Sequence, residues 1–392
     1  MNRRFYVATE DEILKGETTD VYFLRTEKIL KEKGYDNIEV TAEVTASSLP
    51  NGWKWGILAG IEEVAHLFKD KPVDIYAMPE GSVFYPREPV IKIRGRYTDF
   101  ARFETPLLGL ICQASGIATR AARIRKLASD KLILSFGIRR MHPAIAPMID
   151  RAAYIGGFDG FSGVLAEKLL DIPSSGTMPH ALVLVMGDQK KAWMAYDEVL
   201  PKEIPRVMLV DTLSDEKFES LLAAETLGER LTAVRLDTPG SRRGDFKKII
   251  SEVRWELDIR GFTHVKIFVS GGINEEKIRE LNNAPVDGYG IGTYVANAAT
   301  VDFALDIVER EGTPYTKRGK LSGSKQVWEC PQCLRHRVTL FNSSPPKCDI
   351  CGKEMKPLLE PLVKNGKIVK KLPSVKEIRE RVISQLKLLQ LD

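Results

Sequence analysis

Apolar residues in the first part of the chain come in short runs separated by turns. Turn residues at 49–52 and 79–81 divide these runs, and one helix is expected over Trp55–Phe68. Pro106 then begins a long stretch, to about Ser129, with apolar residues at helical spacing. Residues 1–118 are therefore predicted to form an α+β domain with strands at Val40–Val44, Val73–Ala77 and Val90–Ile93.

Residues 119–300 follow a different pattern, in which apolar runs alternate with helical segments such as 215–227, 245–259 and 275–281. Buried strands that alternate with helices indicate a parallel sheet. A full eight-fold barrel needs about 250 residues. We therefore predict an incomplete α/β barrel of about six parallel strands, with a doubly wound open sheet as the alternative. The predicted strands are Lys131–Ile138, Gly157–Phe161, Arg206–Val210, Thr232–Leu236, Val265–Val269 and Gly288–Ile291.

The C-terminal region, residues 301–392, contains four of the five cysteines. Cys330 and Cys333 form one CxxC pair, and Cys348 and Cys351 form a second. Two such pairs at this distance are typical of a structural zinc site, in which four thiolates leave no position for substrate. A small zinc ribbon is predicted at about 327–357, and an amphipathic helix at Val375–Leu391. A disulfide pair or redox thiols are the alternatives.

The charge is distributed unevenly. The net charge is +5, but residues 313–392 carry 17 Lys and Arg against 7 Asp and Glu. A basic tail is compatible with nucleic acid, although this one has few aromatic residues for base stacking. No apolar run approaches the roughly 18 residues of a membrane-spanning helix. Acidic residues at 10–12 interrupt the N-terminus before any secretory signal forms. We expect a cytoplasmic protein with no membrane partner.

Small and charged residues follow the predicted parallel strands. In such a barrel the loops after the strands share one face, where active sites lie. Glycine and hydroxyl residues before a helix suit a phosphate, because backbone N–H groups can approach it there. Neither GxxxxGK[ST] nor GxGxxG occurs. The best phosphate candidates are the loops Ser270-Gly271-Gly272 and Gly290-Ile291-Gly292-Thr293.

Several of these stretches, taken in order, resemble nicotinate phosphoribosyltransferases, whose barrel family also contains quinolinate phosphoribosyltransferase. The resemblance spans about residues 19–293. The motifs that carry it are Thr19-Asp20-Val21-Tyr22, Ala118-Thr119-Arg120-Ala121-Ala122-Arg123, Phe136-Gly137-Ile138-Arg139-Arg140, Gly176-Thr177-Met178-Pro179-His180, Leu209-Val210-Asp211-Thr212, Val234-Arg235-Leu236-Asp237, Ser270-Gly271-Gly272-Ile273 and Gly290-Ile291-Gly292-Thr293.

The resemblance implies a reaction. Nicotinate attacks C1 of phosphoribosyl pyrophosphate, which gives nicotinate mononucleotide and pyrophosphate in NAD biosynthesis, with ATP hydrolysed as co-substrate. Mg²⁺ on the pyrophosphate would assist its departure, and Zn²⁺ would be structural. The resemblance also implies a homodimer or a higher homo-oligomer with its sites near subunit boundaries.

The resemblance further implies roles for single residues. His180 would accept a phosphoryl group from ATP, and Asp211 and Asp237 would bind ribose hydroxyls or Mg²⁺, or stabilise the cationic transition state. The alternative for His180 is a helix-start or core histidine, and that for the two aspartates is helix capping. Nicotinate would contact Tyr22, Thr177, Arg235 and Arg139; phosphoribosyl pyrophosphate would contact Arg140, Ser270, Gly271, Gly272, Gly290, Gly292 and Thr293. Which of Arg139 and Arg140 meets which substrate group stays open.

The chain departs from the family pattern at three places. Residues 158–163 replace the usual Gly-Thr-Ser-Asn, the Asp237 loop reads Asp-Thr-Pro-Gly instead of Asp-Ser-Gly-Asp, and Pro179 precedes His180. These changes affect the ATP coupling more than the transfer itself. Two other functions stay open: quinolinate phosphoribosyltransferase, and a non-catalytic nucleic-acid-binding protein that uses the basic ribbon.

Overall fold

The computed structural model describes residues 3–391. The chain divides into two compact units, which are described separately. Unit 1 contains Met1–Ala122, Ile155–Gly157 and Ala298–Asp392, and unit 2 contains Arg123–Tyr154 and Phe158–Asn297. Among residues 3–391, no helix is both long enough and apolar enough to cross a membrane.

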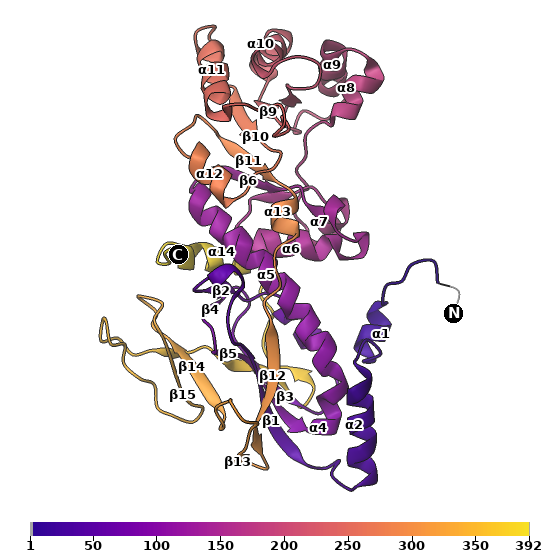
Figure 1. Cartoon of the computed structure of the whole chain (residues 1–392), viewed down its shortest axis with the longest axis vertical. Helices are drawn as coiled ribbons and strands as arrows, with labels where there is room; N and C mark the ends of the chain where they lie inside the picture. Colours follow the sequence, from indigo (N-terminus) through magenta and orange to yellow (C-terminus); the bar gives the residue numbers. More distant parts are fainter. Residues whose placement is uncertain (1–2, 392) are drawn as a thin grey trace. The chain divides into compact units, whose positions relative to one another are not determined.

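Unit 1 is built on a seven-stranded sheet whose neighbouring strands are all antiparallel. One of its interior strands, β1 (Glu39–Ala46), is rich in valine and threonine, which favour extended backbone. The C-terminal region contributes strands at both edges of this sheet (Figure 1). The spatial order is β13 (Thr313–Pro314), β12 (Phe303–Arg310), β1, β5 (Pro89–Arg96), β3 (Asp74–Ala77), β17 (Glu360–Lys364) and β18 (Lys367–Ile368).

Helices α3, α4 and α5 of unit 1 bury apolar side chains against this sheet. The core includes Val44 and Ile91 from the sheet and Leu107 and Ile111 from α5, all without solvent exposure. The pair β2 (Gly56–Ile57) and β4 (Val83–Phe84) forms a separate ribbon. The helices are α1 (Glu10–Leu14), α2 (Val21–Glu32), α3 (Ile61–Leu67), α4 (Tyr97–Phe100), α5 (Glu104–Ala128) and α14 (Val375–Leu386), with 3₁₀ turns at Pro50–Gly52 and Ala101–Phe103.

Two helix predictions in this unit need correction. The helix expected over Trp55–Phe68 begins only at Ile61, because Gly60 has a φ of 96° and breaks the helical backbone. A Cβ at Gly60 would lie 2.4 Å from the carbonyl oxygen of Leu110, so the close packing also requires glycine. The terminal helix ends at Leu386, five residues before the predicted end.

A three-stranded sheet carries the cysteine pairs, with strands β14 (Lys325–Glu329), β15 (His336–Leu340) and β16 (Lys356–Pro357). His336 connects this sheet to the turn after β4 through contacts with two glutamates. Its Nδ1 lies 2.9 Å from Oε2 of Glu88, and its Nε2 lies 3.4 Å from Oε2 of Glu329. Burial by itself lowers the pKa of His336, but hydrogen bonds to Glu329 and Glu88 and their negative charges raise it to about 9.

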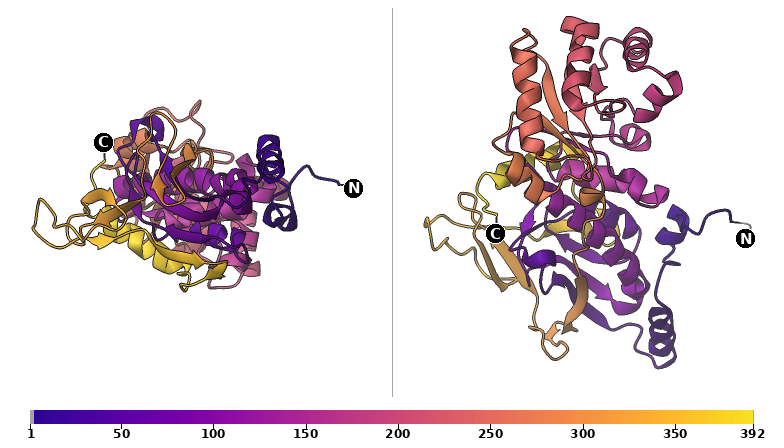
Figure 2. Two further views of the ribbon diagram at one scale, coloured as in Figure 1. Left: turned by 90° about the horizontal axis from the view of Figure 1, so that it is seen from below. Right: turned by 45° about the horizontal axis from the view of Figure 1, so that its top comes forward.

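Unit 2 contains a six-stranded parallel sheet that curls into a half-barrel (Figures 1 and 2). Strands that follow one another in the sequence are neighbours in the sheet, and the last strand, β11, pairs with the first, β6, as in a barrel; the barrel is open between β7 and β8. The doubly wound alternative is therefore wrong. All six predicted strands are present, although most are shorter than expected. In spatial order they are β7 (Gly160–Phe161), β6 (Leu132–Ser135), β11 (Gly288–Ile291), β10 (Lys266–Val269), β9 (Ala233–Leu236) and β8 (Val207–Leu209).

Most strands of the half-barrel lead into a helix, as the alternating pattern predicts. Asp215 caps the N-terminus of α10, and Asp245 caps that of α11. The helices are α6 (Ala146–Ile155), α7 (Val164–Leu170), α8 (His180–Met186), α9 (Gln189–Val199), α10 (Glu216–Leu227), α11 (Phe246–Asp258), α12 (Glu275–Leu281) and α13 (Thr293–Ala296), with 3₁₀ turns at Ile138–Arg140, Pro143–Ile145 and Gly228–Arg230.

The buried His336 should make stability fall at high pH. Because its pKa is raised from 6.5 to about 9 in the folded chain, the stabilisation is complete below pH 6.5 and is lost as the pH rises through 9. His336→Gln should cost about 3 kcal/mol at pH 7, because it leaves the buried Glu88 without its cationic partner. Thermal unfolding between pH 7 and 10 tests this, with the exposed His66→Gln as control. The same change of unfolding temperature with pH in His336→Gln and in the wild type would contradict this prediction.

Candidate active site and metal centre

The carboxyl ends of β8, β9, β10 and β11 bring the predicted site residues of unit 2 together. Asp211 follows β8, Arg235 lies in β9, and Asp237 comes directly after β9. Ser270 follows β10. Since the strands are parallel and adjacent, residues far apart in the sequence meet at one edge of the sheet.

The guanidinium group of Arg235 connects three separate segments. Its Nη1 donates a hydrogen bond to Oγ1 of Thr177 at 2.7 Å, and its Nε donates to Oγ of Ser270 at 2.8 Å. Its Nη2 lies 3.1 Å from Oδ2 of Asp237. The carbon of the guanidinium group lies 5.2 Å from the ring centre of Phe136. The side chain is 14% exposed, so Arg235 is a mostly buried cation at the entrance of the half-barrel.

Two carboxylates lie beside this arginine. Oδ2 of Asp211 accepts hydrogen bonds from the backbone N–H of Asp237, at 2.9 Å, and from the hydroxyl of Thr238, at 3.3 Å. Oδ1 of Asp211 is buried and has no hydrogen-bond partner within residues 3–391. Asp215 and Asp245 are the N-caps of the helices that follow these strands. The capping alternative is therefore wrong for Asp211 and Asp237.

Burial shifts the titration of Asp211. It raises the pKa to about 6, and the negative charge of Asp237 adds to the increase, while His180 lowers the pKa. An aspartate with such a pKa is mostly ionised at neutral pH and protonated at pH 5. The charge at this strand edge therefore depends on pH in the weakly acidic range.

His180 is the first residue of α8 and faces the same group. Its Nδ1 lies 3.1 Å from Oγ1 of Thr212, and its Nε2 lies 3.7 Å from Oδ2 of Asp237. The side chain is 40% exposed, which excludes the alternative of a core histidine. It is a helix-start residue, but its ring is directed to the strand ends and not into the core.

The two predicted phosphate loops lie at the ends of β10 and β11. Gly271 and Gly272 have φ angles of 79° and 66°, which favour glycine. Gly290 lies within β11, and Gly292 directly precedes α13, which begins at the exposed Thr293. The backbone N–H groups of both loops are therefore at the same edge as the carboxylates.

Arg139 and Arg140 lie in the 3₁₀ turn after β6, and both side chains are exposed. Within the described part of the chain neither side chain forms an ion pair or a hydrogen bond. They are two exposed cations at the carboxyl end of a barrel strand.

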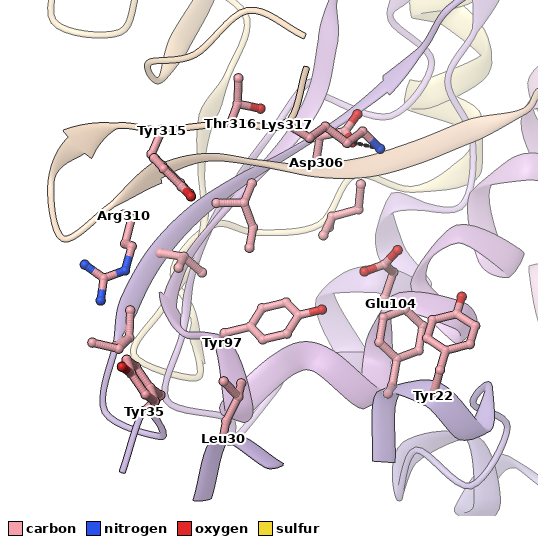
Figure 3. Close-up of a pocket in the computed structure, with 15 residues that line it drawn as sticks. Tyr22, Leu30, Tyr35, Tyr97, Glu104, Asp306, Arg310, Tyr315, Thr316 and Lys317 are labelled. Carbon is pink, nitrogen blue, oxygen red and sulfur yellow. Dashed lines mark ion pairs between the residues drawn. The ribbon is translucent and has the colours of Figure 1, made fainter. Parts of the chain in front are cut away.

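Tyr22 lies in unit 1, unlike the other predicted nicotinate contacts. It is in the first turn of α2 and lines a pocket of about 600 Å³ with Tyr97, Glu104 and Asp306 (Figure 3). Burial and the nearby charge of Asp306 raise the pKa of Glu104 to about 7. The contact of Tyr22 with nicotinate stays a prediction.

Several residues of the site were missed at the sequence level. Glu219 accepts hydrogen bonds from three backbone N–H groups of the loop after β8, at residues 212–214. Glu216 accepts from the hydroxyl of Thr238, and Arg243 bonds to the loop after β10. An acidic residue in the first turn of a helix ordinarily signals helix stabilisation, so the pattern offered no reason to select these glutamates.

The four predicted zinc ligands converge in unit 1. Their sulfur atoms all lie within 4.8 Å of one another, with contacts from 3.3 to 3.8 Å. A zinc–sulfur bond of about 2.3 Å in a tetrahedron gives sulfur–sulfur edges of about 3.8 Å. A disulfide bond would need about 2.0 Å. The donor set and its spacing therefore fit a tetrahedral metal and not a disulfide pair.

Comparison with known proteins agrees with this geometry. The family "Quinolinate phosphoribosyl transferase, C-terminal domain" matches residues 117–306, and its N-terminal counterpart matches residues 20–115. "Nicotinate phosphoribosyltransferase C-terminal domain" matches residues 336–392. The solved structure of nicotinate-nucleotide pyrophosphorylase from Pyrococcus furiosus is 57% identical, with 98% of each chain covered and a TM-score of 0.96. The chain belongs to the nicotinate phosphoribosyltransferase family.

More distant relatives extend this result. Nicotinate phosphoribosyltransferase pncB1 of Mycobacterium tuberculosis is 29% identical over 347 residues, which cover 79% of this chain and 76% of that protein. Human nicotinic acid phosphoribosyltransferase has the same fold, with a TM-score of 0.77 at 22% identity and with 95% and 94% of the two chains covered. The resemblance inferred from the motifs is confirmed. An enzyme is also confirmed, which removes the support for a non-catalytic nucleic-acid-binding protein.

The raised pKa of Asp211 predicts a pH dependence. If the ionised carboxylate is needed, kcat/KM should rise about tenfold per pH unit up to about pH 6 and then level off. The measurement is the rate of nucleotide formation between pH 4.5 and 8. In Asp211→Asn the residual activity should lose this acidic limb. An unchanged limb in Asp211→Asn would assign the titration to another group.

Proposed function

We propose that this family member transfers the phosphoribosyl group of phosphoribosyl pyrophosphate to nicotinate and releases pyrophosphate. The observation that carries the proposal is the cluster around Arg235. It joins the Arg235 cation to Asp237 and to Ser270 at the start of the predicted phosphate loop, and Asp211 is hydrogen-bonded to the backbone N–H of Asp237. The Pyrococcus furiosus relative is named a nicotinate-nucleotide pyrophosphorylase. Pyrophosphorolysis of nicotinate nucleotide is the same transfer in the reverse direction.

The nicotinate carboxylate is assigned to Arg235 and Thr177. A guanidinium group binds a carboxylate with two parallel hydrogen bonds, and the hydroxyl of Thr177 is 2.7 Å from Nη1. A cavity of about 770 Å³ that Thr177 and Phe268 also line lies at the amino ends of the strands, beside Lys131, and is therefore not assigned to nicotinate. Arg139, after β6, would complete the site within unit 2, and the contact of Tyr22 with nicotinate stays a prediction.

Phosphoribosyl pyrophosphate is assigned to the loops after β10 and β11, with its 5′-phosphate on the backbone N–H groups. Asp211 and Asp237 would hold the ribose hydroxyls and stabilise positive charge at C1 when the pyrophosphate leaves. The unpartnered buried oxygen of Asp211 fits an additional ligand such as a hydroxyl or a hard cation. Mg²⁺, when bound, would neutralise charge on the leaving group. Arg140 would contact the pyrophosphate.

His180 is proposed as the acceptor of a phosphoryl group from ATP. Thr212 holds Nδ1, so Nε2 is the nitrogen with the freer approach. Attack by this nitrogen on the terminal phosphorus of ATP would form the nitrogen–phosphorus bond and release ADP. The carboxylate of Asp237, 3.7 Å from Nε2, would stabilise the imidazole while it carries positive charge.

Quinolinate is the second candidate substrate. Quinolinate carries one more carboxylate than nicotinate, and the two free cations Arg139 and Arg140 could bind it. The family descriptions that match residues 20–115 and 117–306 also name quinolinate. The match of residues 336–392 to the nicotinate enzymes favours nicotinate.

A homo-oligomer in the cytoplasm is proposed as the working form. Helix α2 of unit 1 exposes Val21, Leu24 and Ile29, and helix α7 of unit 2 exposes Val164 and Leu169. Apolar surface of this kind supports contact with a second copy. The cytoplasm keeps thiols reduced, which suits the four zinc-binding cysteines.

A product assay tests substrate and ATP coupling together. Nicotinate, nicotinamide and quinolinate would be incubated separately with phosphoribosyl pyrophosphate and Mg²⁺, with and without ATP. Nicotinate mononucleotide, detected by mass spectrometry, should form from nicotinate, and ATP should increase its yield. His180→Ala should reduce the rate with ATP to the ATP-free level of the wild type, because no nitrogen is left to accept the phosphoryl group.

Other outcomes of this assay have distinct meanings. If product forms from quinolinate and from no other compound, quinolinate is the substrate instead of nicotinate. A His180→Ala variant that still responds to ATP would keep the transferase and reject the phosphohistidine. The exposed His66→Gln serves as control for nonspecific effects of histidine loss.

The four cysteines are proposed to hold one structural Zn²⁺. Cys330 and Cys348 are buried, and their sulfurs pack beside Trp328 and Met355 in a small core of their own. So few apolar residues cannot hold a domain together unaided, and a tetrahedral metal would supply the missing stability.

Metal analysis should find about one zinc per chain. The double variant Cys330→Ser/Cys348→Ser should lose the metal and show a lower unfolding temperature, while the isolated Cys112→Ser should keep it. Metal content is measured by plasma mass spectrometry and unfolding by calorimetry. Stoichiometric iron in place of zinc, or an unchanged metal content in the double variant, would contradict the assignment.

A further inference from the structure

Arg243 is a buried arginine of the site to which the proposed function assigns no role. It lies in the loop between β9 and α11, and only 6% of it is exposed. Its Nη2 donates hydrogen bonds to the carbonyl oxygens of Ser270, at 3.0 Å, and Gly271, at 2.7 Å. The carbon of its guanidinium group lies 4.2 Å from the ring centre of Phe246, at the start of α11. One cation thus holds two successive carbonyl groups of the loop after β10.

These two hydrogen bonds determine where the loop's N–H groups point. No peptide bond of the described chain is cis. In a trans peptide the C=O and the following N–H point in opposite directions. Because the carbonyls of Ser270 and Gly271 are directed at Arg243, the N–H groups of Gly271 and Gly272 are directed away from it. The loop therefore presents two adjacent N–H donors on one side and the arginine on the other.

The backbone conformation of the loop supports this arrangement. Gly271 and Gly272 have φ angles of 79° and 66°. Successive N–H groups that converge in this way form a concave site for an anion. A Cβ at Gly271 would lie 3.1 Å from Nη2 of Arg243 and 3.0 Å from the carbonyl oxygen of Asp237. The close approach of Arg243 to the loop therefore favours glycine at position 271.

A purely electrostatic role for Arg243 does not account for its hydrogen-bond partners. The arginine feels the negative charges of Asp237, Asp211, Glu216 and Glu280. Its hydrogen bonds nevertheless go to two carbonyl groups and not to a carboxylate. A charge partner alone would not select two successive carbonyls of one loop. The contacts specify the shape of the loop.

We propose that Arg243 is a positioning residue that turns the N–H groups of Gly271 and Gly272 toward the 5′-phosphate of phosphoribosyl pyrophosphate. Its positive charge, on the far side of the loop, adds to the attraction for the phosphate. The inference rests on the proposed function for the identity of the ligand. It assigns Arg243 to the phosphoribosyl substrate and not to nicotinate.

The test compares three variants. Arg243→Met removes the charge and both hydrogen bonds, Arg243→Lys keeps the charge with a different donor geometry, and Arg242→Met changes the exposed neighbouring arginine as a matched control. Arg243→Met should raise KM for phosphoribosyl pyrophosphate roughly ten- to a hundredfold, the range for lost charge-assisted hydrogen bonds. KM for nicotinate should stay within about twofold. Arg243→Lys should show an intermediate increase in KM for phosphoribosyl pyrophosphate, and Arg242→Met should show no increase.

Binding of ribose 5-phosphate, measured by titration calorimetry on the full chain, makes the test independent of turnover. Its Kd should rise in Arg243→Met by the same factor as KM. If the wild type binds ribose 5-phosphate but converts no pyridine carboxylate, the proposed function fails while this inference can still be judged from the variants. If Arg243→Met does not fold, the Kd and KM of Arg243→Lys alone test the proposal.

Two results would overturn the proposal. One is an equal increase in KM for both substrates, which would mean that Arg243 only stabilises the fold. The other is an unchanged Kd for ribose 5-phosphate in folded Arg243→Met and Arg243→Lys. No binding of ribose 5-phosphate by the wild type would count equally against it.

Discussion

The site depends on one buried cation, the guanidinium group of Arg235. It is held in place by Thr177, Ser270 and Asp237, which come from three different segments of unit 2. A buried positive charge is costly unless it is paired and hydrogen-bonded. The same bonds that satisfy Arg235 therefore also fix the Thr177 segment and the start of the phosphate loop. The proposed substrate carboxylate would therefore meet a guanidinium group whose orientation is already fixed.

The carboxylates beside Arg235 are ordered by contacts with neighbouring loops. The backbone N–H of Asp237 fixes Asp211, and Glu219 fixes the loop that carries Thr212, which in turn contacts His180. These contacts reduce the reorganisation that a charged transition state would require. Because burial weakens the acidity of Asp211, the arrangement also makes the charge of the site sensitive to weakly acidic pH.

Unit 1 is stabilised by the same principle of paired buried charge. Its sheet is completed at both edges by strands from the C-terminal region, which also carries the cysteine cluster. His336 then joins the cysteine-bearing sheet to Glu88, and Gln385 of α14 bonds to the backbone of Val83 and Gly81. The extension is therefore part of the unit's architecture, and its cysteine cluster lies at the ends of its strands.

Local pattern was enough for the six parallel strands, the long helix α5 and the clustering of the four cysteines, because strand and helix periods and CxxC spacing are properties of short segments. Motif order also predicted that His180, Asp211, Arg235 and Ser270 share one site, and the structure brings these side chains to one strand edge. The start of α3 was missed because the close packing of Gly60 on Leu110 is a long-range contact. The roles of Arg243, Thr212 and Glu219 likewise required the tertiary structure. Their partners are backbone groups of other loops, and only the folded chain determines which backbone groups need a partner.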